Sequence, residues 1–250
     1  MPNGSVGSVP DRPYTLLSCA VSLDGYLDDG SPDRLILSGP EDLDEVDALR
    51  AAADAILVGA GTVRADNPRL LVRDPARVAA REAAGRPPQP LRVTLTGAGD
   101  LDPAARFFAG PGTPLVYVGS PAAAAAAEKF KGKAAVIDAG AEPSLGAVLR
   151  NLYLERSVAT VLIEGGALIL RDALAGGLAD ELRLAIAPFF VADPAAPRFG
   201  LQARYQNTAA NPMTLTSLRQ VGAVAVHHYR LTPDPTRPPA APEGDGRTGG

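Results

Sequence analysis

Short apolar runs alternate with polar or amphipathic stretches along most of the chain, and this alternation predicts its secondary structure. Leu43, Val46 and Leu49 recur on one helical face, preceded by the acidic Glu41 and Asp42, which suit the positive end of a helix. The predicted helices are Glu41–Ala53, 121–130, Leu145–Leu154 and Ala167–Ala175. The predicted strands are Tyr14–Ser22, Ala55–Val58, Leu91–Thr96, Leu115–Val118, Ala134–Ile137, Val158–Ile163, Asp180–Val191, Met213–Arg219 and Val221–Leu231.

The order of these elements predicts the fold class. Strands that alternate with helices and then follow one another directly indicate an α/β fold, with a mixed, mostly parallel sheet that is flanked by helices and ends in antiparallel strands. Gly222 is expected to mark a bulge near the start of the last strand. Residues 1–12 and the Pro/Gly-rich residues 233–250 lack an apolar period and are expected to be disordered. We therefore expect one domain over residues 13–232.

Composition narrows the class of protein. The chain is 46% hydrophobic over 250 residues, which is enough to form a buried core. No apolar run reaches the roughly 18 residues of a membrane span, and the first residues lack the basic and apolar regions of a signal peptide. The single Cys19 excludes an intrachain disulfide and favours a reducing compartment, so we expect a cytoplasmic location without a membrane partner.

Charge and residue counts exclude two further classes. A net charge of −4 and an aromatic content of 5% argue against a nucleic-acid partner, because both charge attraction and base stacking would be weak. One cysteine and two histidines make a structural metal site improbable, so no metal is expected. Any phosphate must be bound by a few local arginines and by helix N-termini.

The stretch 51–73 carries the strongest functional signal. Its apolar run Ala55–Val58 ends at Gly59-Ala60-Gly61-Thr62, and a polar turn from Arg64 to Arg69 is expected to follow. A buried strand that breaks into a Gly-rich turn brings backbone N–H groups together, which is how α/β proteins bind phosphates. A tight turn explains Gly59 and Gly61 about equally well, because Arg64 stands where the dinucleotide fingerprint has its third glycine.

A second Gly-rich turn, Glu164-Gly165-Gly166, follows another buried strand and precedes a helix. Two such turns at one edge of a sheet favour a dinucleotide ligand over two accidental turns. Glu164 can accept hydrogen bonds from a polar heterocycle, or it can be a capping or surface carboxylate. Asp66 can bind a ligand or form an Asx-turn, and Asp24 with Gly25 is also a common turn signal.

The residues show no nucleophile–base set and no paired carboxylates. Such an absence suits chemistry that needs few protein groups. Hydride transfer is of this kind, because the cofactor carries the reaction while the protein supplies position and charge.

These motifs, in this order, resemble the pyrimidine reductases of riboflavin biosynthesis, the C-terminal reductase domain of the bacterial bifunctional deaminase/reductase. The resemblance covers roughly residues 13–232 and implies a dihydrofolate-reductase-like fold. It is carried by Ser22–Gly25, Leu49-Arg50, Ala55–Leu70, Glu164–Gly166 and the run from Gly177 through Leu182 to Pro188. No deaminase motif precedes the match, so we expect a stand-alone reductase.

The family reduces 5-amino-6-(5-phosphoribosylamino)uracil to the ribitylamino compound with NADPH, and the resemblance implies hydride transfer to C1′ of the opened ribose. It also implies a homodimer, for which strands 180–191 and 213–231 are the expected interface. With the Gly-rich turns included, the expected NADPH-binding residues are Ala20, Gly59, Gly61, Thr62, Asp66, Gly165, Gly166, Ala167 and Leu168. The expected substrate-binding residues are Ser22, Asp24, Arg50, Leu70, Arg73 and Glu164, with Arg50 and Arg73 suited to the ribose phosphate. No catalytic acid or base is assigned.

The chain departs from the family pattern at several positions. Ser18 stands where many bacterial members carry Lys, Leu35 where they carry Trp, Asp33 where they carry Ser, and Gly97 where a Ser-type cofactor contact occurs. Two alternatives therefore stay open. One is a reductase of the same fold that acts on another pyrimidine or a dihydropterin, and the other is a nucleotide-binding protein without turnover.

Overall fold

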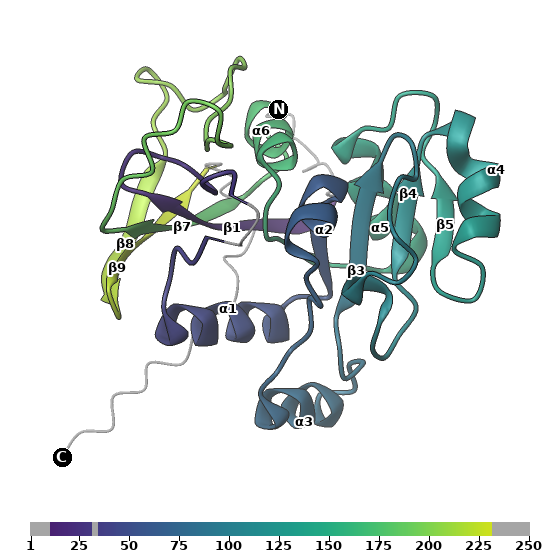
Figure 1. Cartoon of the computed structure of the whole chain (residues 1–250). Coiled ribbons are helices and arrows are strands. Elements are labelled where there is room, and N and C mark those ends of the chain that lie inside the picture. The colour runs from purple at the N-terminus through teal and green to yellow at the C-terminus, as the bar shows by residue number, and fades with distance from the viewer. Residues whose placement is uncertain (1–10, 32–34, 232–250) are drawn as a thin grey trace, which may run out of the picture.

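A nine-stranded sheet organises the computed structural model, which describes residues 11–31 and 35–231. The strand order is β5-β4-β3-β2-β6-β1-β7-β9-β8, and Figure 1 shows the sheet crossing the molecule from β5 at one end to β8 at the other. The strands are β1 (Tyr14–Ser22), β2 (Ala55–Gly59), β3 (Leu91–Thr96), β4 (Leu115–Val118), β5 (Ala135–Asp138), β6 (Thr160–Ile163), β7 (Glu181–Ala187), β8 (Thr214–Val221) and β9 (Val224–Arg230).

Pairing from β5 through β7 is parallel, and only the β7–β9 and β9–β8 pairs are antiparallel. This arrangement confirms the predicted fold class. The helices are α1 (Pro40–Ala52), α2 (Ala60–Asp66), α3 (Pro75–Ala83), α4 (Ser120–Lys129), α5 (Leu145–Arg156) and α6 (Ala167–Ala175), with a short 3-10 turn at Arg106–Phe108.

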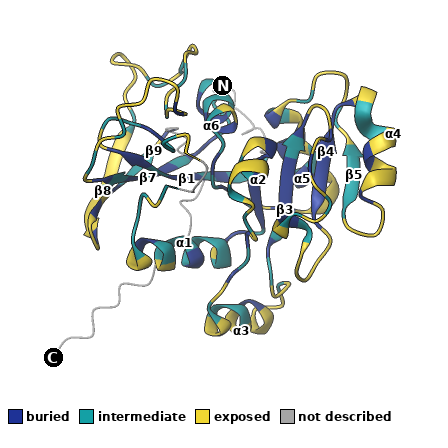
Figure 2. Ribbon diagram, in the orientation of Figure 1, coloured by how far each residue is buried: buried dark blue, intermediate teal, exposed yellow. Residues whose placement is uncertain are grey.

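Helices pack on both faces of the central strands because successive strand residues point to opposite sides. Leu57 of β2 packs with α5 and α6 in one apolar cluster, whereas its neighbours Ile56 and Val58 pack with α2 and α4 in another. Figure 2 shows the central strands as the most deeply buried part of the molecule. The sheet is therefore covered on both faces, and its strand ends are where ligands can reach the backbone.

Two predictions for the last strands of the chain are wrong in detail. The strand predicted as 180–191 ends at Ala187, because Pro188 has no N–H to donate to the ladder. The expected bulge at Gly222 is absent, since Gly222 (φ +55) lies in the two-residue turn that joins β8 to β9. The irregularity instead lies within β8, between Leu215 and Ser217.

The segment after β2 also differs from the prediction. The expected polar turn from Arg64 is largely the helix α2, which begins at Ala60 and buries Ala60 and Val63 against the sheet. Asn67, in the left-handed region at φ +43, ends this helix. Helix α3 was not predicted, although Asp74 caps its first turn through the Ala76 N–H at 2.8 Å and Pro75 occupies the first helical position.

The segments expected to be disordered lie outside the described residues, with the exception of 11 and 12. Arg12 donates to both carboxylate oxygens of Asp180, at 2.8 and 3.0 Å, and so joins the start of β1 to the start of β7. Within the described ranges, no helix combines the length and the apolar character that a bilayer crossing requires.

Candidate active site

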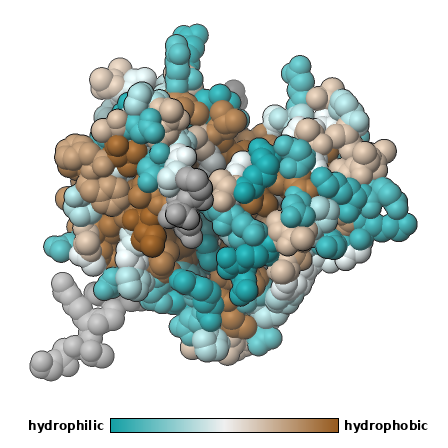
Figure 3. All heavy atoms as spheres, viewed as in Figure 1, coloured by the Kyte–Doolittle hydropathy of each residue, from teal (hydrophilic) through white to brown (hydrophobic). Residues whose placement is uncertain are grey.

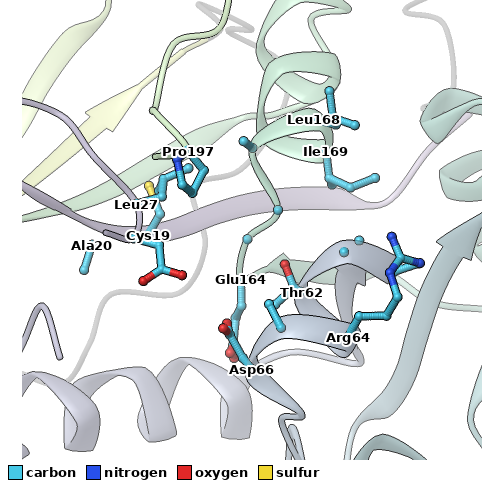
Figure 4. A pocket seen from close by; sticks show the side chains of 18 of the residues that line it. Cys19, Ala20, Leu27, Thr62, Arg64, Asp66, Glu164, Leu168, Ile169 and Pro197 are labelled. Atoms are coloured by element: carbon cyan, nitrogen blue, oxygen red, sulfur yellow. The ribbon is translucent and has the colours of Figure 1, made fainter. Parts of the chain in front are cut away.

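A cavity of about 790 Å³ opens where β1, β2, β3 and β6 end, on the carboxyl side of the parallel strands. Open α/β sheets bind their ligands at this edge, and the volume is that of a small-molecule or cofactor site. Figure 4 shows side chains from β1, α2, the β6–α6 connection and α6 converging on it. We take this cavity as the candidate active site.

The two Gly-rich turns lie against each other at the cavity wall. The N–H of Gly59 donates to the carbonyl oxygen of Gly165 at 3.4 Å. A Cβ on Gly166, whose φ is +93, would lie 3.2 Å from Oγ1 of Thr62 and 3.4 Å from the backbone nitrogen of Gly59. A Cβ on Gly59 would lie 3.0 Å from Ile169 of α6. Glycine is therefore required at these positions for α6 to approach β2 closely.

The remaining glycine of the second turn faces open space. A Cβ on Gly165 would meet no atom within 4 Å, and Gly165 lines the cavity although it is buried. Helix α6 begins immediately afterwards with Ala167 and Leu168, and its first N–H groups have no partner within the helix. A cavity-lining backbone beside the start of a nine-residue helix fits the phosphate groups of a dinucleotide.

The structure brings together every residue expected to bind the cofactor. All of them line the one cavity: Ala20, Gly59, Gly61, Thr62, Asp66, Gly165, Gly166, Ala167 and Leu168. They come from the ends of three neighbouring strands and the helices that follow β2 and β6. Their assignment to NADPH stays a prediction.

Of the residues expected to bind substrate, Glu164 lines the cavity. Arg50 of α1 lies beside it, where Nε donates to Oε1 and Nη2 to Oε2, each at 2.6 Å. Nη1 of Arg50 also donates to the carbonyl oxygen of Leu71 at 3.2 Å. Burial lowers the pKa of Arg50, but the hydrogen bonds and charge of Glu164 outweigh burial and raise it above its usual value. The two hydrogen bonds fix the orientation of the Glu164 carboxylate.

Ser22 and Asp24, whose expected role at the substrate stays a prediction, organise the turn after β1. The hydroxyl of Ser22 donates to Oδ1 of Asp24 at 2.6 Å, and Asp24 accepts the backbone N–H groups of Val191 and Ala192 at 3.1 and 2.9 Å. Desolvation raises the pKa of Asp24, but these hydrogen bonds together hold it below its usual value. Neither residue lines the cavity.

Leu70 and Arg73 do not line the cavity. Leu70 (φ +52) is buried in the apolar cluster with Val63 and Phe107. Nη2 of Arg73 donates to the carbonyl oxygen of Leu43 at 2.7 Å, and its Nε lies 3.4 Å from Oδ1 of Asp47. A substrate role for either residue stays a prediction, because the cavity reaches neither of them.

Several cavity residues were not among the expected binding residues. At one end the wall is apolar and is formed by Leu27, Leu35, Ile36, Leu37, Leu43 and Pro197. At the other end Arg64 and Asp100 face the cavity. Apart from Leu43 of α1, these residues come from loops and from a helix that resembled a turn, so no strand-end pattern marked them. The proline-flanked loop residues also lack the periodicity that makes a buried position visible in sequence.

The positions that depart from the family pattern are placed differently from one another. Leu35 and Gly97 line the cavity, whereas Ser18 is buried on β1 outside it, and Asp33 lies outside the described residues. Cys19 also lines the cavity, but burial raises the pKa of its thiol to about 12, despite the charge of Arg183. Its sulfur is therefore not a nucleophile at neutral pH.

The sheet order and the edge cavity fit the dihydrofolate-reductase-like α/β fold that the sequence motifs implied. The RibD C-terminal domain family matches residues 13–227, and the chain belongs to this family. The resemblance inferred from the sequence motifs is thereby confirmed.

Known relatives and solved structures agree with this assignment. The chain is 36% identical, over 74% of its length and 85% of the relative's, to the 2,5-diamino-6-ribosylamino-4(3H)-pyrimidinone 5′-phosphate reductase of Archaeoglobus fulgidus. It superimposes on a pyrimidine reductase-like protein of Corynebacterium diphtheriae with a TM-score of 0.73 at 25% identity, covering 92% of this chain and 97% of that one. Acinetobacter baumannii RibD gives a TM-score of 0.72 at 26% identity, covering 89% of this chain and 59% of that longer one.

Proposed function

We propose that the chain reduces a phosphoribosylamino-pyrimidine of riboflavin biosynthesis with NADPH, converting 5-amino-6-(5-phosphoribosylamino)uracil to its ribitylamino product. The observation that carries this proposal is the convergence of all the expected cofactor residues and Glu164 on one cavity. If the chain were a nucleotide-binding protein without turnover, these residues would lie together without a use in catalysis. A reductase explains why they share one cavity.

The residues divide the work between two sides of the cavity. Gly165 and the start of α6 accept the phosphates of the dinucleotide, and Thr62, beside Gly166, contributes a hydroxyl. Glu164, held by Arg50, orients the pyrimidine or the ribose hydroxyls. The apolar wall around Leu35 and Leu43 excludes water from the reacting atoms. When bound, the nicotinamide supplies the hydride.

A second candidate substrate is favoured by the names of the relatives. The Archaeoglobus fulgidus protein and a Methanothermobacter thermautotrophicus protein, 34% identical over 72% of this chain, are both named for the 2,5-diamino-6-ribosylamino-4(3H)-pyrimidinone 5′-phosphate. That compound differs from the uracil at the 2-position of the ring, where it carries an amino group. The choice between the two therefore depends on which ring edge the cavity accepts.

The test is the loss of NADPH absorbance with each candidate substrate. The purified chain is mixed with NADPH and with the uracil compound, the 2,5-diamino compound or dihydrofolate. Oxidation with either phosphoribosylamino-pyrimidine supports the proposal, and the faster of the two identifies the substrate. Oxidation with dihydrofolate alone moves the protein to the pteridine reductases. If NADPH binds but no substrate is reduced, the chain is a nucleotide-binding protein and the proposal is wrong.

We further propose that two copies associate through β8. This strand lies at one end of the sheet and carries the exposed Leu215 and Leu218, and exposed strand edges of this kind pair readily. Figure 3 shows apolar atoms on the side of the molecule where β7, β9 and β8 lie. Light scattering on the wild type and on Leu218→Lys tests the proposal: it requires a dimer that the lysine weakens, and a monomeric wild type contradicts it.

A further inference from the structure

An exposed ion pair stands at the β3 end of the cavity. Nη1 of Arg64 donates to Oδ1 of Asp100 at 2.9 Å, and Oγ1 of Thr96 donates to the same oxygen at 3.1 Å. All three residues line the cavity, and the side chains of Arg64 and Asp100 are 47% and 57% exposed. A ligand in the cavity can therefore reach both members of the pair.

Arg64 has an unusual place in the charge pattern of the cavity. Among the described residues that line it, Arg64 is the one cationic side chain, whereas Asp28, Asp66, Asp100 and Glu164 are acidic. An anionic ligand that fills this cavity thus meets a single guanidinium. That guanidinium lies next to a carboxylate, so an anion that binds it must compete with Asp100.

The direction of Arg64 separates it from the substrate side. Figure 4 shows its side chain extending from α2 away from Glu164 and Asp66. Nη2 lies 4.0 Å from where a Cβ on Gly61 would stand, so the guanidinium folds back along the cavity side of α2. Within the part of the chain that the structure describes, Nη1 is bonded to Asp100, and neither Nε nor Nη2 donates a hydrogen bond to another residue. A pair of adjacent donors is therefore available to a ligand.

The chemistry of this pair matches one part of the cofactor. A guanidinium fork binds a phosphate monoester bidentately, and a carboxylate accepts a hydrogen bond from a ribose 2′-hydroxyl. Dinucleotide-binding proteins use these two groups to distinguish NADP from NAD. We infer that Arg64 recognises the 2′-phosphate of NADPH and that Asp100, which holds Arg64 in the free protein, favours the 2′-hydroxyl of NADH.

This inference rests on the proposed function, since it assumes that a nicotinamide dinucleotide occupies the cavity. It adds a residue-level cause for cofactor preference. The two side chains oppose each other: Arg64 attracts the 2′-phosphate, while Asp100 repels it and occupies one of its donors. Removing the charge of Arg64 should therefore shift the preference toward NADH, and removing the charge of Asp100 should shift it toward NADPH.

The experiment measures binding without substrate. NADPH, NADH and adenosine 2′,5′-bisphosphate are titrated into the wild type, Arg64→Ala, Arg64→Lys and Asp100→Asn. We expect Arg64→Ala to weaken NADPH and the bisphosphate about tenfold, the effect of losing one hydrogen-bonded charge pair in a solvated site, and to leave NADH nearly unchanged. Lysine should restore part of the loss, because it keeps the charge without the fork. Asp100→Asn should tighten NADPH and weaken NADH, each by about two- to threefold.

Arg150→Ala is the matched control. Arg150 pairs with Asp11 at 2.6 Å, with side chains 59% and 65% exposed, and it lies outside the cavity. This variant removes an arginine–aspartate pair that is somewhat more exposed and lies away from the cavity, so its affinities for both dinucleotides should equal those of the wild type.

Three outcomes overturn the inference. One is an equal loss of NADPH and NADH affinity in Arg64→Ala, which would make Arg64 a general part of the site. Another is unchanged affinity for NADPH, NADH and the bisphosphate in that variant, with an unchanged KM for the phosphorylated pyrimidine. The third is unchanged dinucleotide binding with a raised KM for the phosphorylated pyrimidine, which would assign Arg64 to the substrate. The proposed function is tested separately: it is wrong if the wild type binds NADPH but reduces no pyrimidine.

Discussion

Two arginine–carboxylate pairs flank the cavity, and their surroundings differ sharply. Arg50 and Glu164 make two bonds of 2.6 Å, and their side chains are only 17% and 9% exposed. Arg64 and Asp100 make one bond of 2.9 Å and are about half exposed. The first pair joins α1 to the end of β6, and the second joins α2 to the segment after β3.

The difference in burial predicts a difference in role. Breaking a buried pair leaves an uncompensated charge away from water and costs about 3–5 kcal/mol, whereas an exposed pair contributes about 0–1 kcal/mol. The Arg50–Glu164 pair is therefore a fixed part of the framework, which holds one carboxylate at the substrate side. The Arg64–Asp100 pair is weak enough for a ligand to exchange with it.

The largest expected effect follows from breaking the buried pair. Arg50→Met should lower the free energy of unfolding by about 3 kcal/mol, because the buried carboxylate of Glu164 loses its partner. Urea denaturation followed by circular dichroism measures this change. The matched control is Arg64→Met, which should change the free energy of unfolding by less than about 1 kcal/mol. Similar losses in the two variants would contradict the comparison.

A second variant separates the charge of Glu164 from its place in the framework. Glu164→Gln keeps the size of the side chain and one hydrogen-bond acceptor for Arg50, so the fold should survive. We expect kcat to fall by about tenfold or more, because the reactants lose a group that orients them, while the affinity for NADPH stays within about twofold. A loss confined to cofactor affinity would move Glu164 from the substrate side to the cofactor side.

A third variant tests whether the cofactor occupies the part of the cavity beside Gly61. Gly61 lies in α2 with ordinary helical backbone, and a Cβ there would meet only Nη2 of Arg64, at 4.0 Å. Gly61→Val should therefore fold normally but occupy cavity space, weakening NADPH binding by about tenfold. Fluorescence titration gives the affinity, and Ala80→Val, at an exposed position of α3, controls for a β-branched residue in a helix. Unchanged NADPH affinity would place the cofactor elsewhere.

The smallest expected effect is the response to salt. An exposed charge is screened at moderate ionic strength, so raising the salt from low to physiological concentration should weaken NADPH binding about two- to threefold more than NADH binding. The difference should disappear in Arg64→Ala, which lacks the cation. A salt effect that persists in this variant would assign the charge attraction to another group.

The two Gly-rich turns were accessible to sequence reasoning for a physical reason. Gly59 and Gly166 stand at or just beyond the ends of apolar runs, and parallel strands bring such ends to one edge. Ala20, within β1, was indicated only by the family resemblance. The substrate-side residues were less accessible. Arg50 and Arg73 were expected to contact the ribose phosphate. Their carboxylate partners, Glu164 and Asp47, depend on packing between elements, and no pattern in the sequence indicated these contacts.

Local pattern also misjudged the segment after β2. Gly59, Gly61 and Asn67 suggested a turn, but burial of Ala60 and Val63 stabilises a helix between them. This tertiary contact outweighs the weak helix propensity of glycine. Because the segment is helical, Arg64 projects along α2 toward Asp100 rather than from the tip of a loop.

Hydrophobic periodicity and glycine placement act over a few residues, so the amino-acid pattern was enough to indicate the class of fold, most strand positions and the two turns at the sheet edge. The order of the strands and the pairing of charges depend on contacts between residues far apart in the chain. Arg50 meets Glu164 across 114 positions, and Arg64 meets Asp100 across 36. Only the folded chain decides which of these pairs is shielded from water, and that burial separates a fixed support from an exchangeable contact.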